Sequence, residues 1–445
     1  MHDALVPRRF VVFAAIILTI IVFFSSSNDI SPREFVWGVY NHGWNPNSKP
    51  DVFNSLPVDS QAIRNICSAS NWNSSLIFTC DNNRGGVANV RNSILNCVRL
   101  TIAAGGSLVL PQIYLRELND GMGSNTDINR RGLLKQQGMD YMFDLNHFSS
   151  SLRQSCPELL LIRHLDQKPD QRRHWLQPEN LFPNIPTSGF EHPEEWPRRL
   201  NDWLEINIPP PSTPDAKEPI VIDLGQSFLH YPTHSDGHAV AHIFGNILKF
   251  RADIRELATK ALNTLVEWYE LPVNISHAGI LKPSFLGVHL NTNDPLLEER
   301  HRPDIQYSHY ETQSQAYLKL SYDMNLPIIY VASGNIDDVQ KFNDKAIGPS
   351  IAVTYKEHLL EEKDHQQLQR LTYDQRAMVD YLVLSKAEAF AGVGHSPFSW
   401  NVAMTREQLG AVMEGQLADD IWKDGMNTLF GVRPDYVESS ACMWP

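Results

Sequence analysis

The chain has 445 residues, of which 42% are apolar and 20% are charged, as in a globular protein. That length exceeds what one ordinary hydrophobic core organises, so two domains are expected. The formal net charge of −13 argues against a nucleic-acid partner, because no basic patch offsets it. It does not exclude a small phosphate-bearing ligand, which needs only a local pocket.

The N-terminus carries a targeting signal. Arg8 and Arg9 precede an apolar run from Phe10 to Phe24 that only Thr19 interrupts. This run is short for a membrane span, which usually takes about 20 residues. We favour a signal anchor, with the arginines cytosolic, residues 10–24 in the membrane and the rest luminal. A cleaved signal peptide is the alternative. Both interpretations place the globular part in the secretory lumen or outside the cell.

Glycosylation sequons and cysteines agree with an oxidising lumen. The sequons at Asn73 and Asn274 accept a glycan only if they are exposed and luminal. No CxxC and no Cys/His metal spacing is present. Up to two disulfides could form with one thiol left over. The sequence does not fix the pairing, although a Cys67–Cys80 bridge would close a short local loop. The five cysteines are Cys67, Cys80, Cys97, Cys156 and Cys442.

Regular structure is expected to begin after a stem and irregular lead-in at residues 31–75. A strand at 76–80 is followed by a glycine-containing loop and a helix that Gly105 and Gly106 end, and a further strand spans 107–111. This β-loop-α-β unit is the building block of a parallel sheet. The helix has apolar residues on one face, at Val90, Ile94, Val98 and Ile102.

The segment from about 165 to 218 is dense in proline, tryptophan and charge, which predicts an irregular connection without long elements. A buried strand at 219–224 and a long helix from Ala252 to Tyr269 follow. The next predicted elements are a strand at 285–290 and a second β-loop-α-β series. That series comprises a strand at 327–333, a helix at 336–346 and a strand at 350–355.

The stretch from Val379 to Arg406 predicts an apolar helix, a strand ending at Gly392, and a tight loop closed by a new helix. Ser396 stands where an N-cap is expected, and Pro397 suits the first helical position. A glycine-flanked loop that opens onto a helix N-terminus is a ready anion site. Such a helix start is more often a plain cap.

Two other sequence features suggest a ligand site. Paired glycines at Gly85 and Gly86 join a strand to a helix and allow close approach of a ligand, although a tight turn is the commoner explanation. His289 and Asp294 follow a strand, where α/β proteins usually bind ligands. A structural histidine is the alternative, and the charged run at 298–302 is typical of a solvated surface. No DxD triplet is present, so metal-dependent sugar transfer is not expected.

Four blocks together resemble the GDP-fucose protein O-fucosyltransferase-like superfamily, and most closely its fungal membrane-anchored members. They are GGVANVRNSILNCVRLTIAAGGSLVLP, FLGVHLNTND, PIIYVASGNIDDVQKF and LTYDQRAMVDYLVLSKAEAFAGVGHSPFSWNVAMTR. The resemblance covers roughly residues 76–435. It implies a GT-B fold, in which two Rossmann-like α/β domains face each other across a nucleotide-sugar cleft. It also implies metal-independent, inverting transfer of fucose from GDP-fucose to a protein or glycan hydroxyl.

The resemblance also implies roles for particular residues. It places His289, Asn291 and Asp294 at the catalytic motif. It assigns donor binding to two groups, one at the glycine loop and one in the last block. These are Gly85, Gly86, Asn89 and Arg91, then Asp380, Ser396, Phe398 and Ser399. The serine and the helix start are expected to hold the β-phosphate, and the aromatic ring to lie near the nucleoside.

The chain departs from the family pattern at two positions. Members carry arginine where this chain has Asn291, and that arginine stabilises charge on the leaving diphosphate, for which asparagine is no substitute. Pro397 stands where the family usually has a second serine. An active fucosyltransferase therefore needs a compensating cation, for which Arg91, Arg300, His301 and Arg302 are candidates.

Three hypotheses follow: an active transferase, a catalytically degenerate protein that binds a nucleotide sugar or glycan, and a structural protein with an empty cleft. The expected organisation is a cytosolic tail and anchor at 1–30, the stem, a first Rossmann-like domain at 76–280, and a nucleotide-sugar-binding domain at 281–445. This organisation predicts a single-pass type II membrane protein of the Golgi or endoplasmic reticulum. Its expected partners are the nucleotide sugar, an acceptor and the membrane, and no metal cofactor is expected.

Overall fold

A computed structural model describes most of the chain beyond residue 50. Residues 51–445 belong to one compact unit, and no helix among the described residues is long and apolar enough to cross a membrane. The expected membrane segment at 10–24 and the expected site residue Asp294 lie outside the described residues. The described residues are 51–115, 136–165, 173–208, 219–225, 228, 230–277, 279–292, 305–414 and 421–445.

The first sheet has five parallel strands in the order β5-β2-β1-β7-β6, which confirms the predicted parallel α/β organisation. Its strands are β1 (Leu76–Thr79), β2 (Ser107–Val109), β5 (Leu161–Ile162), β6 (Arg173–Leu176) and β7 (Ile220–Leu224). A separate antiparallel pair comprises β3 (Gln112–Tyr114) and β4 (Gln136–Gly138). Phe78 and Leu108 face the main core beside α4 (Val87–Ala104), whereas Ile77 and Val221 form a small cluster on the opposite face.

Helix α4 ends as its sequence predicts. Its C-terminal Gly105 has a left-handed φ of +66°, a conformation that glycine adopts without steric penalty. The remaining elements before the second sheet are helices and short 3₁₀ turns. The helices are α3 (Gln61–Ser68), α5 (Leu145–Ser155), α6 (Pro178–Leu181), α7 (Trp196–Asn207), α8 (His238–Ile243) and α9 (Ala252–Trp268). The 3₁₀ turns are η1 (Met139–Tyr141), η2 (Pro193–Glu195), η3 (Thr233–Asp236) and η4 (Phe244–Ile247).

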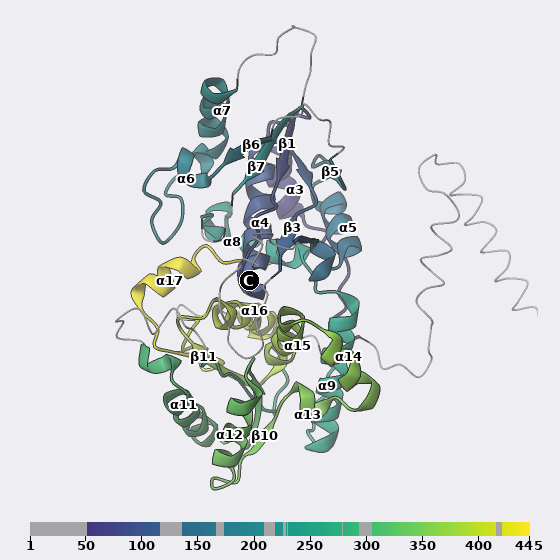
Figure 1. Ribbon diagram of the computed structural model, residues 1–445, viewed down its shortest axis with the longest axis vertical. Helices are drawn as coiled ribbons and strands as arrows, with labels where there is room; N and C mark the ends of the chain where they lie inside the picture. Colours follow the sequence, from purple (N-terminus) through teal and green to yellow (C-terminus); the bar gives the residue numbers. More distant parts are fainter. Residues whose placement is uncertain are drawn as a thin grey trace, which may run out of the picture. The chain divides into compact units, whose positions relative to one another are not determined.

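The second sheet is also parallel and five-stranded, in the order β10-β9-β8-β11-β12. Helices α15 and α16 cover one face, and α11 and α12 cover the other (Figure 1). The strands are β8 (Leu286–His289), β9 (Ile328–Ala332), β10 (Ala352–Thr354), β11 (Ala389–Val393) and β12 (Asn427–Phe430). The helical elements are η5 (Ile305–Ser308), α11 (Tyr310–Asp323), α12 (Ile336–Ala346), α13 (Lys356–Leu359), α14 (Glu362–Arg370), α15 (Tyr373–Lys386), α16 (Pro397–Glu414) and α17 (Pro434–Ser440).

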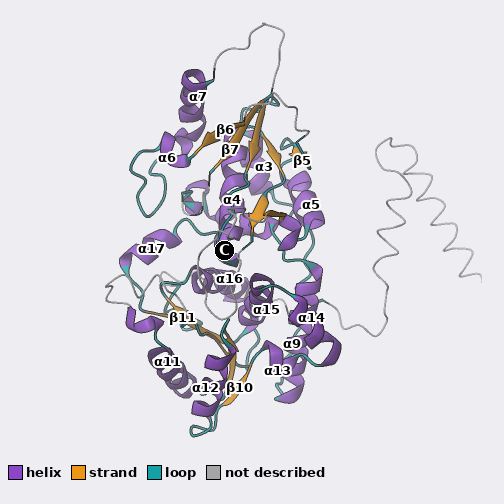
Figure 2. Ribbon diagram, viewed as in Figure 1, coloured by secondary structure: helices purple, strands orange, loops and turns teal. Residues whose placement is uncertain are grey.

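Two expectations about local structure are wrong. The lead-in contains the regular helix α3, whose N-cap Ser60 accepts a hydrogen bond from the Ile63 amide. The proline-rich segment contributes strand β6 and the 12-residue helix α7 (Figure 2). Helix α7 forms because its proline lies in the first turn, where no intrahelical donor is lost, and because Trp196 is fully buried.

The structure gives the disulfide pairing that the sequence left open, with two disulfides and one remaining thiol among the five cysteines. Cys67 pairs with Cys156 and Cys80 pairs with Cys97, so the Cys67–Cys80 alternative is excluded. Cys442 is the remaining, buried thiol. The two pairs join elements that pack side by side, α3 with α5 and the end of β1 with α4. The domain boundary at residue 280 stays a prediction.

Candidate nucleotide-sugar site

The topology of the second sheet marks one position for a ligand. The chain runs from β8 to β9 and β10 on one side and then crosses to β11 on the other side of β8. In open α/β sheets ligands bind beyond the carboxyl ends of the strands at such a switch point. His289 ends β8, and the loop from Gly394 to Ser396 follows β11. The predicted site residues of both segments therefore lie at the switch point.

Helix α16 begins as predicted, at Pro397 with Ser396 as its N-cap. The Ser396 hydroxyl accepts a hydrogen bond from the Ser399 amide over 3.4 Å, and its carbonyl accepts one from Trp400. A hydroxyl that accepts one bond keeps its O–H to donate. The first-turn amides of a helix have no intrahelical partner, and the helix dipole is positive there. The start of α16 can therefore bind an anion.

His289 and Ser399 contact each other directly. The Nδ1 atom of His289 lies 2.9 Å from the Ser399 hydroxyl, and its ring packs against Phe398 with 4.6 Å between ring centroids. Burial, with nearby His395 as a second cause, lowers the pKa of His289 from 6.5 to about 3. The imidazole is therefore neutral at physiological pH. It can hold one proton for a hydrogen bond but carries no positive charge.

Gly392 leaves the space in which this pair forms. A Cβ atom at this position would lie 2.5 Å from the Ser399 hydroxyl oxygen and 2.7 Å from its Cβ. The Val393 amide also donates to that hydroxyl, over 3.4 Å. The end of β11 and the first turn of α16 are thus too close together for a side chain to fit at position 392. A glycine at the end of this strand is a condition for the His289–Ser399 contact.

The main chain of Asn291 is fixed by a side chain that sequence analysis did not identify. Gln313 of α11 accepts a hydrogen bond from the Asn291 amide over 2.9 Å and donates to its carbonyl over 2.6 Å. The next residue, Thr292, donates to Asp338 at the start of α12 over 2.6 Å. The segment after β8 is thereby attached to both helices on that face. Asp294 follows this segment, outside the described residues.

Asp380 lies in a buried cluster. Its carboxylate accepts hydrogen bonds from Tyr330 and from the Lys356 ammonium, each over 2.8 Å. Burial raises the pKa of Asp380 to about 6, while Lys356 acts in the opposite direction. Both oxygens already have a partner, so Asp380 serves the packing of α15 against β9 and α13. The structure does not bring it into contact with Ser396 or His289.

The glycine loop of the first sheet has an equivalent position. Strand β1 lies at the switch point of that sheet, between β2 and β7, and the loop leads into α4. Gly85 has a φ of +99°, and a Cβ there would lie 2.8 Å from Asn89 Nδ2. Gly86 is the N-cap of α4 and lacks a capping side chain. Arg84, on the same loop, places its guanidinium 4.6 Å from the Tyr114 ring centroid.

Arg91 has a different environment from the one expected. Its guanidinium is buried and donates to the carbonyl oxygens of Trp444, over 2.7 Å, and Gly245, over 3.0 Å, and to Pro445. Burial lowers the pKa of this guanidinium. Asn401 of α16 donates to the same Trp444 oxygen over 2.8 Å. Arg91 thus attaches the C-terminal segment to α4 and is not presented to a donor phosphate.

The carboxyl edge of the first sheet carries two acids. Burial, and then the nearby Asp223 carboxylate, raise the pKa of Asp81 to about 6, against the opposing effect of Arg173. The Arg173 guanidinium lies 3.7 Å from an Asp81 oxygen. Burial also raises the pKa of Asp223, which pairs in register with Thr79 of β1. A carboxyl group with a pKa near neutrality can accept a proton from a hydroxyl at working pH.

No described residue offers a usable metal site near these helices. One described group brings metal-ligating residue types together, namely Cys67, Cys156 and Glu158, and its two thiols are joined in a disulfide. The expectation that no metal is needed stays a prediction.

Comparison with known proteins identifies the family. The sequence profile described as GDP-fucose protein O-fucosyltransferase matches residues 76–409. This range runs from β1 into α16 and covers the first sheet and four of the five strands of the second, and the chain belongs to this family. No curated protein matches the chain in a sequence search.

The similar solved structures are distant in sequence. POFUT1 in complex with GDP-fucose is 14% identical, with 82% of this chain and 99% of that chain covered and a TM-score of 0.47. A variant of Arabidopsis thaliana FUT1 in complex with GDP is 10% identical, with 78% and 73% covered and a TM-score of 0.39. NodZ alpha-1,6-fucosyltransferase soaked with GDP-fucose is 10% identical, with 76% and 93% covered and a TM-score of 0.32. The family assignment rests on the sequence profile.

Proposed function

We propose that this protein is a GDP-fucose-dependent glycosyltransferase of GT-B type that transfers fucose, with inversion, to a hydroxyl of a protein or glycan. The observation that carries the proposal is the contact between His289 and Ser399 at the start of α16. That contact lies at the switch point of the second sheet, in a chain that belongs to the O-fucosyltransferase family. Family membership supports the donor; the acceptor is unassigned.

In this proposal the diphosphate of the donor lies at the start of α16. The Ser396 O–H and the first-turn amide of Phe398 donate to phosphate oxygens, and the helix dipole favours the charge. The Ser399 hydroxyl donates to Nδ1 of His289, which leaves Nε2–H free to donate to the donor. His289 then acts as a neutral hydrogen-bond donor. Its pKa of about 3 makes it a poor general base at neutral pH.

The reaction itself needs charge stabilisation that Asn291 does not supply. The acceptor oxygen forms a bond to the anomeric carbon, and the bond from that carbon to the phosphate oxygen breaks with its electron pair going to GDP. The acceptor proton leaves to a base. Negative charge therefore grows on the diphosphate, and a cation there is typically worth about 10²–10³ in rate. Neither Asn291 nor the neutral His289 provides one.

We assign this compensating role to Arg84. It lies on the glycine loop immediately before Gly85, at the switch point of the first sheet. The starts of α4 and α16 are joined through the Trp444 carbonyl, which Arg91 and Asn401 share. The two predicted ligand loops thus precede helices that pack together. Arg300, His301 and Arg302 lie outside the described residues, and Arg91 is occupied by main-chain oxygens.

The alternative is a degenerate transferase that binds a nucleotide sugar or glycan without turnover. Asn291 is the specific observation that favours it, because an arginine at this position would act more strongly in the transition state than in the ground state. The proposal of a fucosyltransferase also includes the luminal, type II membrane location that residues 8–24 predict.

The test of the donor site compares two serines that are both helix N-caps. Ser396→Ala and Ser60→Ala each remove a cap, at a cost of about 1 kcal/mol. Ser396→Ala should also weaken GDP binding by about 10-fold or more, since it removes a donor to a charged phosphate. Ser60→Ala should leave GDP binding unchanged. Equal GDP affinity in both variants would show that the site lies elsewhere.

The role of Arg84 needs a separate measurement. Arg84→Gln should lower the rate of GDP release from GDP-fucose by about 10²-fold while changing GDP-fucose affinity much less. Arg198→Gln, at an exposed arginine of α7, is the matched control. If Arg84→Gln leaves the turnover rate unchanged, Arg84 has no role in the mechanism. Binding that persists in EDTA would support a metal-independent donor site.

A further inference from the structure

A groove of about 570 Å³ lies at the amino end of the first sheet, away from the proposed donor site. Its walls come from the segment after α3, the end of α4, the region around Pro193 and the start of α7. Asn73, the asparagine of the first sequon, is one of its lining residues and is itself exposed. The groove is thus adjacent to a modification sequence of this same chain.

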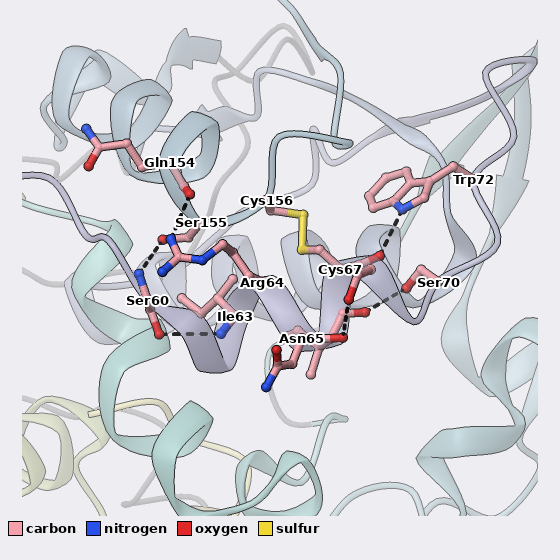
Figure 3. Close-up of a disulfide and its surroundings, with 12 residues drawn as sticks. Ser60, Ile63, Arg64, Asn65, Cys67, Ser70, Trp72, Gln154, Ser155 and Cys156 are labelled. Carbon is pink, nitrogen blue, oxygen red and sulfur yellow. Dashed lines mark hydrogen bonds between the residues drawn. A yellow bond between two sulfur atoms is a disulfide. The ribbon is translucent and has the colours of Figure 1, made fainter.

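The wall that carries Asn73 is held rigidly. The Cys67–Cys156 disulfide fixes the end of α3 to α5, and the indole N–H of Trp72 donates to the Cys67 carbonyl over 2.9 Å (Figure 3). Behind this wall, Gly105 accepts a hydrogen bond from the Asn73 amide over 2.7 Å. A Cβ atom at Gly105 would lie 2.0 Å from the Asn71 carbonyl oxygen. The groove wall is therefore preformed and does not depend on a bound ligand.

The geometry of Asn73 suits glycan attachment. The Ser75 amide donates to Asn73 Oδ1 over 3.0 Å. This local turn engages the carbonyl oxygen of the side chain and leaves Nδ2 as the atom that can bond a sugar. Asn274 of the second sequon repeats the arrangement, with the Ser276 amide 2.9 Å from its Oδ1. Asn274 is also exposed and lines a smaller groove of about 270 Å³.

We propose that Asn73 and Asn274 both carry N-linked glycans, and that the inner sugars on Asn73 lie in the groove beside Trp72. In the modification step Nδ2 forms a bond to the anomeric carbon of the first sugar and loses a proton. The bond from that carbon to a lipid-linked diphosphate breaks, and the diphosphate leaves with the electron pair. The donor is thus a lipid-diphosphate oligosaccharide of the secretory pathway. The proposal rests on the luminal location included in the proposed function, and it is independent of fucosyl transfer.

The groove lining suits a sugar. Trp72 supplies an aromatic face, and the side chains of Asn71, Asn201 and Glu194 supply polar groups around it. On another wall, the Arg99 guanidinium is paired with Asp236 over 2.5 Å and 2.6 Å, so that neither leaves an uncompensated charge toward a neutral ligand. The occupant is the chain's own glycan because Asn73, which carries its attachment atom, is an exposed residue that lines the groove.

The experiment expresses the full chain in a eukaryotic secretory host and measures occupancy of both asparagines by mass spectrometry after enzymatic deglycosylation in ¹⁸O water. Both peptides should carry the label. Asn73→Gln and Asn274→Gln should each remove one glycan from the intact mass. Asn71→Gln, which alters an exposed asparagine of the same groove outside any sequon, should remove none. Unlabelled Asn73 and Asn274 peptides from the wild-type chain would overturn the proposal.

Placement of the glycan in the groove is tested on the folded protein. Sugars packed against Trp72 should resist an endoglycosidase in the native state and be released once the chain is denatured. The glycan on Asn274, beside the smaller groove, is the internal comparison. Release from Asn73 at the same rate in native and denatured protein would show that the groove does not hold the glycan.

Discussion

Arg91 of α4 and Asn401 of α16 donate hydrogen bonds to the same atom, the carbonyl oxygen of Trp444, over 2.7 and 2.8 Å. Each lies in the second turn of its helix, just after the loop that sequence analysis singles out. The Trp444 side chain is fully buried, and its indole N–H donates to Asn96 over 2.6 Å. Trp444 therefore sets the distance between the N-terminal parts of α4 and α16, two helices that pack against different sheets.

Trp444→Ala should destabilise the fold by about 3–5 kcal/mol, since it removes a fully buried aromatic side chain. It should also weaken GDP binding, because the carbonyl oxygen that Arg91 and Asn401 share is held in place by the packing of this buried side chain. Trp175→Ala, at an exposed tryptophan of β6, should change the free energy of unfolding by about 0.5 kcal/mol or less. Chemical denaturation of both variants provides the measurement. Equal stability of the two would mean that the tail does not join the helices.

Gly392→Ala should disrupt the His289–Ser399 contact, because the new Cβ would overlap the serine side chain. Overpacking of this kind typically costs about 1–3 kcal/mol. Gly348→Ala is the matched control, since a Cβ there meets nothing within 4 Å. We expect lower GDP affinity for the first variant and unchanged affinity for the second. If the Gly392→Ala variant bound GDP as tightly as the wild-type chain, donor binding would not depend on the position of Ser399.

The sequence predicts the local elements well where one short segment contains the whole signal. The α16 start is an example, because Ser396 and Pro397 define an N-cap and a first turn without reference to the rest of the chain. The ends of β1, β8 and β11 follow from apolar runs bounded by turn residues. Their meeting at switch points follows only once the strand order is known.

Roles that depend on distant contacts were not predictable. The role of Arg91 depends on Trp444, which is 353 positions away. The carboxylate of Asp380 accepts hydrogen bonds from Tyr330 and Lys356, which come from separate elements. Helix α7 differs from the prediction because a proline in the first turn of a helix does not break it. Disulfide pairing likewise requires the packing of α3 on α5.

His289 should not titrate between pH 5 and pH 8, since its pKa is lowered from 6.5 to about 3. Below pH 6.5 the unfolded chain binds a proton that the folded protein takes up only near pH 3. The free energy of unfolding should therefore fall as the pH is lowered through this range. His289→Gln should remove this part of the dependence. A ring proton resonance of His289 that shifts with a midpoint near or above 6.5 would contradict the neutral assignment.

Asn291→Arg should raise the rate of GDP release from GDP-fucose by about 10²-fold or more, because a guanidinium stabilises the leaving diphosphate where the amide does not. Gln313, which fixes the Asn291 main chain, keeps the new side chain at the same point of the sheet edge. Asn335→Arg, at an N-cap of the same sheet edge, controls for added charge. A rate that rises equally in both variants would show a general electrostatic effect.

The most direct test of the central claim is calorimetric titration of the wild-type chain with GDP-fucose in the presence of EDTA. The account predicts saturable binding at a single site, weakened in Ser396→Ala and in Gly392→Ala and retained in Ser60→Ala and Gly348→Ala. Absence of binding to the folded wild-type chain, or binding that neither Ser396→Ala nor Gly392→Ala weakens, would contradict a nucleotide-sugar site at the start of α16.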